Sequence, residues 1–266
     1  MLTLIIALLI GGACGYAAYA EWNWGWGVAC GIMGFLLSQV VIGLILRGAI
    51  KNRQDRIQKI LQEAQQKINK QLNLFQIRPP SSQKAAQQIL EKIQLDAARK
   101  ALEATDAFKP LYLWNLMLKK QIAAMRMQLY YQLREFKKVD ECLKTALLID
   151  SQSVAIGLAR MYRNEDAGLD KFYAAKARRV RDEGAAFVAS VYAWIKIRQG
   201  DETAAREALV AAKKKSDHPV LLDNLDKLLN GKVKQFSNAG FGDIWYALFL
   251  EEPKVKQQRQ RQGRPY

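Results

Sequence analysis

Two long apolar runs, Leu2 to Ala20 and Gly27 to Leu46, occupy most of the first 46 residues. Each run is close to the ~20 apolar residues that a helix needs to cross ~30 Å of hydrocarbon. Tryptophan rings favour the headgroup layer of a bilayer, which suits the short loop between the runs. The tryptophans of that loop are Trp22, Trp24 and Trp26. The pattern predicts a transmembrane helical hairpin over residues 1–46.

No Lys or Arg precedes Arg47, and basic residues follow the second run at once. Short flanking segments rich in Lys and Arg stay on the cytoplasmic side of a membrane. The cations expected at the membrane interface are Arg47, Lys51, Arg53 and Arg56. We therefore expect a multi-pass membrane protein, typical of a bacterial inner membrane, with the rest of the chain in the cytoplasm.

A cleaved signal peptide is the main alternative for the first run, since Ala18-Tyr19-Ala20 matches a small-residue cleavage site. Signal peptides start with a basic region and have a shorter apolar core, whereas this chain starts Met-Leu-Thr-Leu-Ile-Ile. The uncleaved hairpin is favoured. The cytoplasmic placement depends little on this choice, because the second run still leaves the remaining chain on the side of Arg47.

Four glycines in the apolar runs form two pairs with a four-residue spacing, which removes side chains from one face of each helix. They are Gly11 and Gly15, and Gly27 and Gly31. Such faces allow close backbone contact, either within one hairpin, which is favoured, or between hairpins of a homo-oligomer. Neither run contains Asp, Glu, Lys, Arg or His, which argues against transport.

Residues 47–80 are predicted to form a basic juxtamembrane helix or stalk. Apolar residues recur at steps of three and four from Ile57 to Phe75, which is typical of an amphipathic helix. Three arrangements remain open: a helix packed on its own domain, a short coiled coil, or a basic helix lying on anionic lipid. Pro79 and Pro80 end the helix, because consecutive prolines lack backbone donors.

The formal net charge of +16 favours anionic partners, such as membrane lipid, nucleic acid or an acidic protein face.

The three cysteines show no metal or disulfide spacing, and the sole histidine, His218, cannot form a catalytic triad or metal cluster. The adjacent Glu251 and Glu252 are expected to serve solubility. We expect no enzymatic activity, no metal and no cofactor.

Beyond Pro80 the chain reads as successive helical segments without strand alternation, which predicts an all-α fold. Small or apolar residues recur there in three similar patterns. The copies are Ala98, Leu102, Thr105 and Pro110; Val139, Leu143, Ala146 and Ser151; and Ala205, Leu209 and Ala212. The second and third copies are separated by about two 34-residue periods, so a weaker copy is expected near residues 151–181. This pattern resembles the tetratricopeptide repeat.

The resemblance covers residues 82–219 and departs from the family pattern at Arg126, Lys196 and Glu202. It implies an α-solenoid of helix pairs within a domain over residues 81–235, with a groove that binds a peptide or helix. The groove positions carried over are Gln121, Gln128, Gln132, Trp194 and Arg198. Amides beside an aromatic ring and a guanidinium suit an acidic or aromatic ligand. Trp194 also fits a buried core position, and the glutamines also fit a solvated face.

Residues 236–252 are predicted to contain a capping helix that begins at Asp243 and closes the open end of the solenoid. Docking on the membrane or on a partner is the alternative. Residues 253–266 are basic and are predicted to be disordered.

These patterns together predict a membrane-anchored cytoplasmic scaffold or adaptor that recruits an unidentified protein partner to the bilayer. One alternative is a basic, membrane-tethered binder of anionic lipid or nucleic acid. The other is a structural subunit of an oligomeric membrane assembly.

Overall fold

The computed structural model describes residues 2–80 and 82–253, and every regular element in those ranges is a helix. The expected all-α fold is thereby confirmed for the described part of the chain. Contacts between residues divide the chain into two compact units, which meet between Leu147 and Leu148. This boundary lies inside the range that the sequence pattern assigned to one helical domain.

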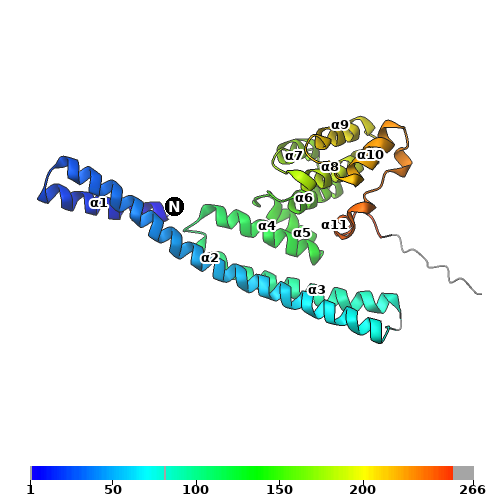
Figure 1. Ribbon diagram of the computed structural model, residues 1–266, viewed down its shortest axis with the longest axis horizontal. Coiled ribbons are helices and arrows are strands. Elements are labelled where there is room, and N and C mark those ends of the chain that lie inside the picture. The colour runs from blue at the N-terminus through cyan, green and yellow to red at the C-terminus, as the bar shows by residue number, and fades with distance from the viewer. Residues whose placement is uncertain (1, 81, 254–266) are drawn as a thin grey trace, which may run out of the picture. The chain divides into compact units, whose positions relative to one another are not determined.

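The first unit begins with α1 (Leu2–Glu21), which folds back along the much longer α2 (Trp24–Ile77) (Figure 1). The side chain of Asn23 caps α2 by accepting from the backbone N–H of Trp26. With 54 residues, α2 is about 80 Å long at ~1.5 Å per residue. The second apolar run and the basic segment after it therefore share one uninterrupted helix.

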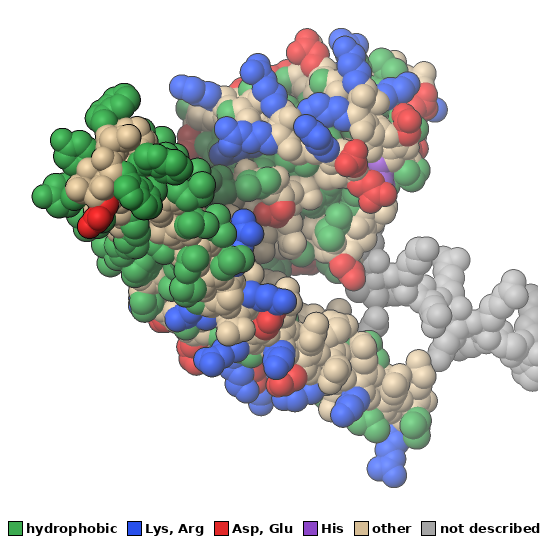
Figure 2. All heavy atoms as spheres, turned by 60° about the vertical axis from the view of Figure 1, so that its left-hand side comes forward, with side chains coloured by type: hydrophobic (Ala, Val, Ile, Leu, Met, Phe, Trp, Pro, Cys, Tyr) green, Lys and Arg blue, Asp and Glu red, His purple; other side chains and the backbone are tan. Residues whose placement is uncertain are grey.

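Both helices are long and apolar enough to cross a membrane, as far as length and composition decide. Only 17% of the most apolar window of α1 and 6% of that of α2 is buried within the protein. Figure 2 shows this end of the molecule covered by hydrophobic side chains. The apolar surface is not the interior of a compact soluble core.

The four paired glycines lie where α1 and α2 touch. A Cβ atom on Gly11 would lie 2.8 Å from the carbonyl oxygen of Gly31, and one on Gly15 would lie 2.9 Å from that of Gly27. Those distances leave no room for a side chain. The glycine faces are thus used within one chain to bring the two backbones together.

The second half of α2 packs against α3 (Gln83–Thr105), whose first turn is capped by Ser82. Ile57 and Ile68 of α2 are buried. Of the three arrangements left open for the basic segment, the structure has the helix packed on its own unit. The first of the three repeated patterns lies on α3 from Ala98 to Thr105 and continues to Pro110 in η1.

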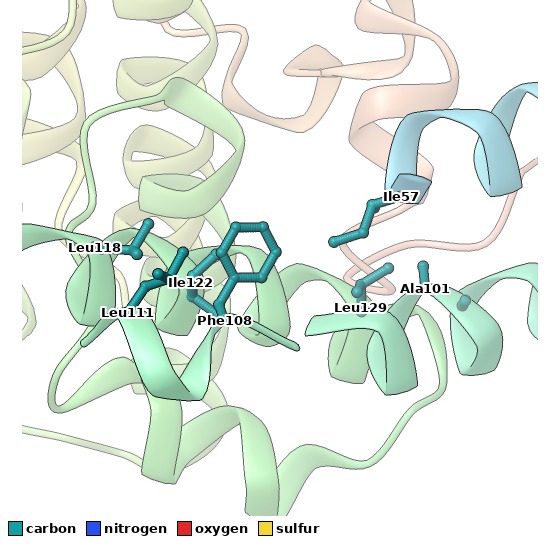
Figure 3. Close-up of a cluster of buried hydrophobic side chains, with 8 residues drawn as sticks. Ile57, Ala101, Phe108, Leu111, Leu118, Ile122 and Leu129 are labelled. Carbon is teal, nitrogen blue, oxygen red and sulfur yellow. The ribbon is translucent and has the colours of Figure 1, made fainter. Parts of the chain in front are cut away.

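The first unit is completed by η1 (Asp106–Leu111), α4 (Leu116–Gln132) and α5 (Phe136–Leu143). Apolar side chains of η1 and α4 form a core with α2 and α3. Figure 3 shows Phe108 of η1 between Leu111 and Ile122 on one side and Leu129 and Ile57 on the other. This core joins the basic half of α2 to η1 and α4.

The second unit contains two helical hairpins, α6 (Ser151–Arg163) with α7 (Leu169–Ala177), and α8 (Asp182–Arg198) with α9 (Glu202–Lys213). It continues with α10 (Pro219–Leu229), η2 (Val233–Gln235), η3 (Ala239–Phe241) and the short α11 (Asp243–Tyr246). Helix α8 contacts α6 and α10 on either side. The helices α6, α8 and α10 thus form one row, and α7 and α9 pack on it.

Small residues bring α8 and α9 close together. Ala189 and Ala193 of α8 are buried in one cluster with Ala205, Leu209 and Ala212 of α9, which are the third copy of the repeated pattern. Gly200 makes the turn between these helices with a φ of +84°. The weak copy expected near residues 151–181 coincides with the α6–α7 pair. Membership of the tetratricopeptide family and a solenoid over residues 81–235 stay predictions.

Candidate functional site

The chain after α10 turns back and crosses the row of helices α10, α8 and α6. We call residues 236–251 the return segment. Within it Asn238 is buried. Its side-chain oxygen accepts from Asn224 of α10 at 3.0 Å, and its Nδ2 donates to the Ser190 carbonyl of α8 at 2.8 Å. Phe241 stacks on His218 at the start of α10 and meets Phe187 of α8 edge-on. These contacts fix the first half of the segment to α10 and α8.

The second half of the return segment contacts α8 and α6. Trp245, which is fully buried, packs edge-to-face on Trp194 of α8, with 5.5 Å between ring centroids. Trp194 in turn packs edge-on against Tyr162 of α6. Arg163 of α6 donates to the carbonyl oxygen of Phe249 at 2.7 Å. The segment therefore spans three helices that are far apart in sequence.

Glu251 closes the segment onto this face through both carboxylate oxygens. Oε1 accepts from the indole nitrogen of Trp194 at 2.8 Å, and Oε2 accepts from that of Trp245 at 3.1 Å. Arg198 lies 3.5 Å from the same carboxylate, and its guanidinium lies over the Trp194 ring, 5.0 Å from the centroid. A single carboxylate satisfies two buried indole donors and pairs with a cation.

The structure places the five predicted groove residues in different surroundings. Trp194 and Arg198 meet at Glu251, and Trp194 is only 6% exposed. The three glutamines belong to α4 in the first unit, where Gln121 and Gln132 are exposed and Gln128 is half-buried. Trp194 thus has the buried position considered as its alternative, and its polar edge is already bonded.

Two expectations for the end of the chain are corrected. Helix α11 has only four residues, and the chain around it packs on α8 and α6 as well as on α10 instead of covering the last helix alone. Glu251 is a hydrogen-bonding centre and not a solubilising charge. Sequence reasoning missed it because its partners Trp194 and Arg198 are more than fifty positions away, and no local pattern marks the contact.

Lys196, where the family pattern favours an aromatic residue, is buried beside a carboxylate. Its ammonium lies 2.6 Å from Asp170 of α7 and 3.9 Å from Asp201, and the Tyr192 hydroxyl donates to Asp170 at 2.9 Å. Burial acts to raise the pKa of Asp170, but the hydrogen bonds from Lys196 and Tyr192 hold that pKa below its ordinary value. This network ties α7 to α8.

Tyr173 of α7 extends the network by stacking on Tyr192, with 3.8 Å between ring centroids. Burial raises the pKa of Tyr173 to about 12. Burial and the Asp170 carboxylate also raise the pKa of Tyr192. Both phenols are therefore neutral at physiological pH and act as packing groups and hydrogen-bond donors.

The residues expected at a membrane interface are found at the two ends of the apolar surface. Around the α1–α2 turn, the residues Trp22, Trp24 and Trp26 are 69%, 76% and 57% exposed. At the other end Arg47, Lys51 and Arg56 are exposed, whereas Arg53 is half-buried and donates to the Ala49 carbonyl at 3.0 Å. The aromatic and cationic groups bracket the uncovered apolar stretch.

Within residues 2–80 and 82–253 no three His, Cys, Asp or Glu side chains group so as to hold a metal ion. A comparison with models of protein families finds no match, and comparisons with curated proteins and with solved structures find none either.

Proposed function

We propose that this protein is a membrane-anchored scaffold or adaptor, in which the α1–α2 hairpin holds the chain in a bilayer and the second unit binds a protein partner. One observation carries the proposal. The face formed by α6, α8 and α10 binds an irregular segment of chain through buried aromatic rings and a carboxylate that meets two indoles and an arginine. Such anchors are the contacts that dominate protein–peptide recognition.

The chemistry of the return segment indicates the class of partner. A partner segment with an aromatic residue and an acidic residue at a similar spacing would find the same groups, namely the Trp194 ring and the cations of Arg163 and Arg198. Binding then requires that the partner displace part of the return segment. The stretch from Trp245 to Glu251 is the part to displace, since it supplies both the ring that packs on Trp194 and the carboxylate that binds it.

Membrane anchoring by both helices is supported by the glycine contacts. Removal of α1 as a signal peptide would expose the faces at Gly27 and Gly31, which fit the α1 backbone closely. The basic flank that starts at Arg47 then favours a cytoplasmic position for both units. A bacterial inner membrane is the setting that we propose.

The basic alternative has a specific observation in its favour. Exposed cations follow α2 away from the apolar run, and they suit anionic lipid or nucleic acid. They are Arg47, Lys51, Arg56, Lys59, Lys67 and Lys70. Binding to phosphates weakens steeply with salt, whereas recognition by buried aromatic anchors does not. The oligomer alternative loses support, because the glycine faces are already used within the chain.

Photo-crosslinking in membranes tests the proposal. A photoreactive residue replaces Arg198 at the proposed site or, as the control, the exposed Arg206 of α9, in the full-length protein in its native membrane. We expect a crosslinked protein from position 198 alone, retained in high salt and diminished by a synthetic peptide of residues 236–252. Equal products from both positions, or products lost in salt, would contradict the adaptor proposal.

A further inference from the structure

The chain between η1 and α4, together with the first turn of α4, exposes apolar side chains that the core of the first unit does not use. Leu113 is 70% exposed and Met117 is 49% exposed. Their neighbours Leu111 and Leu118 are buried in the core of this unit. The core of this unit is therefore formed without Leu113 and Met117, and their apolar surface is available for another contact.

This segment lies beside the end of the second apolar run. The backbone N–H of Leu2 donates to the carbonyl oxygen of Leu113 at 3.4 Å, so the first turn of α1 touches the segment (Figure 1). Gln39 of α2 donates to the carbonyl oxygen of Thr3 at 3.3 Å. The start of α1 and the adjoining Leu113 therefore lie near the final apolar turns of α2, measured along the axis of that helix.

A second set of contacts, made by α2 itself, places the segment at the same position along the α2 axis. Leu46, Ala49 and Ile50 of α2 pack against the core cluster that contains Leu111. Leu46 is the last residue of the apolar run, and the basic residues begin directly after it. The segment thus lies at the boundary between the apolar and basic parts of α2. In a bilayer that boundary is the headgroup layer.

The residues around Leu113 have the chemistry of that layer. Tyr112 and Trp114 supply half-buried amphipathic rings, and Lys119 and Lys120 are exposed just beyond Met117. Aromatic rings favour the membrane interface, and lysine side chains extend their ammonium groups from apolar surfaces toward lipid phosphates. Apolar side chains next to such groups are typical of segments that lie in the interface.

We propose that Leu113 and Met117 insert into the headgroup layer of the leaflet from which α2 emerges, and so give the first unit a second contact with the bilayer. This inference rests on the proposed membrane insertion of the hairpin. Lipid is the occupant because Leu113 adjoins α1, so the exposed leucine continues the apolar surface of the hairpin itself. Two contacts fix the rotation of the unit about the α2 axis.

Depth-dependent fluorescence quenching tests the inference. The full-length protein, with its three cysteines replaced by alanine, is reconstituted into vesicles of phosphatidylcholine and phosphatidylglycerol. One new cysteine carries an environment-sensitive fluorophore, at Leu113→Cys, at Leu36→Cys in the apolar run, or at Lys70→Cys near the far end of α2. Lipids with a spin label near the headgroup or deep in the acyl chain serve as quenchers.

We expect the label at position 113 to emit at shorter wavelength than that at position 70, and to be quenched several times more by the shallow spin label. The label at position 36 should be quenched most by the deep spin label. If the label at position 36 is quenched but the label at position 113 has the same emission and quenching as the label at position 70, this inference is overturned and the proposed anchor stands. No quenching at 36 overturns the anchor as well.

Two further measurements show whether protein rather than lipid surrounds the label, and whether the variant is folded. A blue-shifted label at position 113 that no spin-labelled lipid quenches would mean that protein covers it, and would overturn the inference. With the label moved to Met117→Cys, the added substitution Leu113→Glu should abolish shallow quenching, because a carboxylate next to lipid phosphates is repelled. Unchanged helical circular dichroism shows that this exposed substitution leaves the fold intact.

Discussion

The Glu251 carboxylate holds the return segment on α8, and its removal has a calculable effect. In Glu251→Ala the indole N–H groups of Trp194 and Trp245 lose their acceptor, although both rings are buried. An unsatisfied buried donor costs about 1–3 kcal/mol. The ion pair with Arg198, a side chain that is 57% exposed, adds less than ~1 kcal/mol. Two such donors cost about 2–6 kcal/mol, and we take the lower part of that range, about 3 kcal/mol, because Glu251 itself is only half-buried.

Hydrogen exchange in the full-length protein in detergent measures this loss, since the segment opens locally. A change of ~3 kcal/mol corresponds to roughly a hundredfold faster exchange of the protected amides, such as those of Leu248 and Phe249. Glu251→Gln keeps one acceptor oxygen and should have a smaller effect. The matched control is Glu252→Ala, an exposed neighbour. If Glu251→Ala exchanges like Glu252→Ala, the carboxylate does not fasten the segment and the reasoning is wrong.

Three other substitutions test single features of the fold. Gly15→Ala should destabilise the hairpin by about 1–3 kcal/mol through overpacking, measured by thermal unfolding in detergent, while Gly12→Ala, which has open space around it, should have little effect. Since the folded-state pKa of Asp170 is lowered, its stabilising contribution is present at neutral pH and lost as the pH falls through that pKa. Asp170→Asn should therefore lower the stability of the second unit to urea at pH 7. It should also make that stability depend less on pH in the acid range. Gly200→Ala should cost ~1 kcal/mol in the same assay, because alanine is strained at positive φ, and no loss would mean that the turn relaxes.

Local patterns predicted the helical elements well where the signal lay within one helix. The two apolar runs marked the apolar helices. The stripe from Ile57 onward marked the helical face on which Ile57 and Ile68 are buried, although its Leu61 and Leu72 stay exposed. The four-residue glycine spacing indicated a close helix contact. The Ala205, Leu209 and Ala212 pattern marked α9, because a helix can approach its partner closely only through small side chains on one face.

Long-range partners explain what the sequence left open. The pattern at Ala98 matched a repeat, and Ala98 and Ala101 of α3 are buried in one cluster with Ile57 of α2. Trp194 matched a groove position, yet its indole bonds to Glu251, a residue 57 positions later. Lys196 was a departure from the pattern, and Asp170 on the preceding helix accounts for it. None of these pairings has a local signature.

The unbroken helical hydrogen bonding of α2 through Arg47 has a mechanical consequence. A flexible linker at this point would let an anchor spin or tilt without effect on what it carries. Here a torsion or tilt of the apolar end is passed along a stiff rod to the level of Ile77, and α3 moves with it. In the membrane arrangement that we propose, the hairpin is therefore a lever as well as a tether.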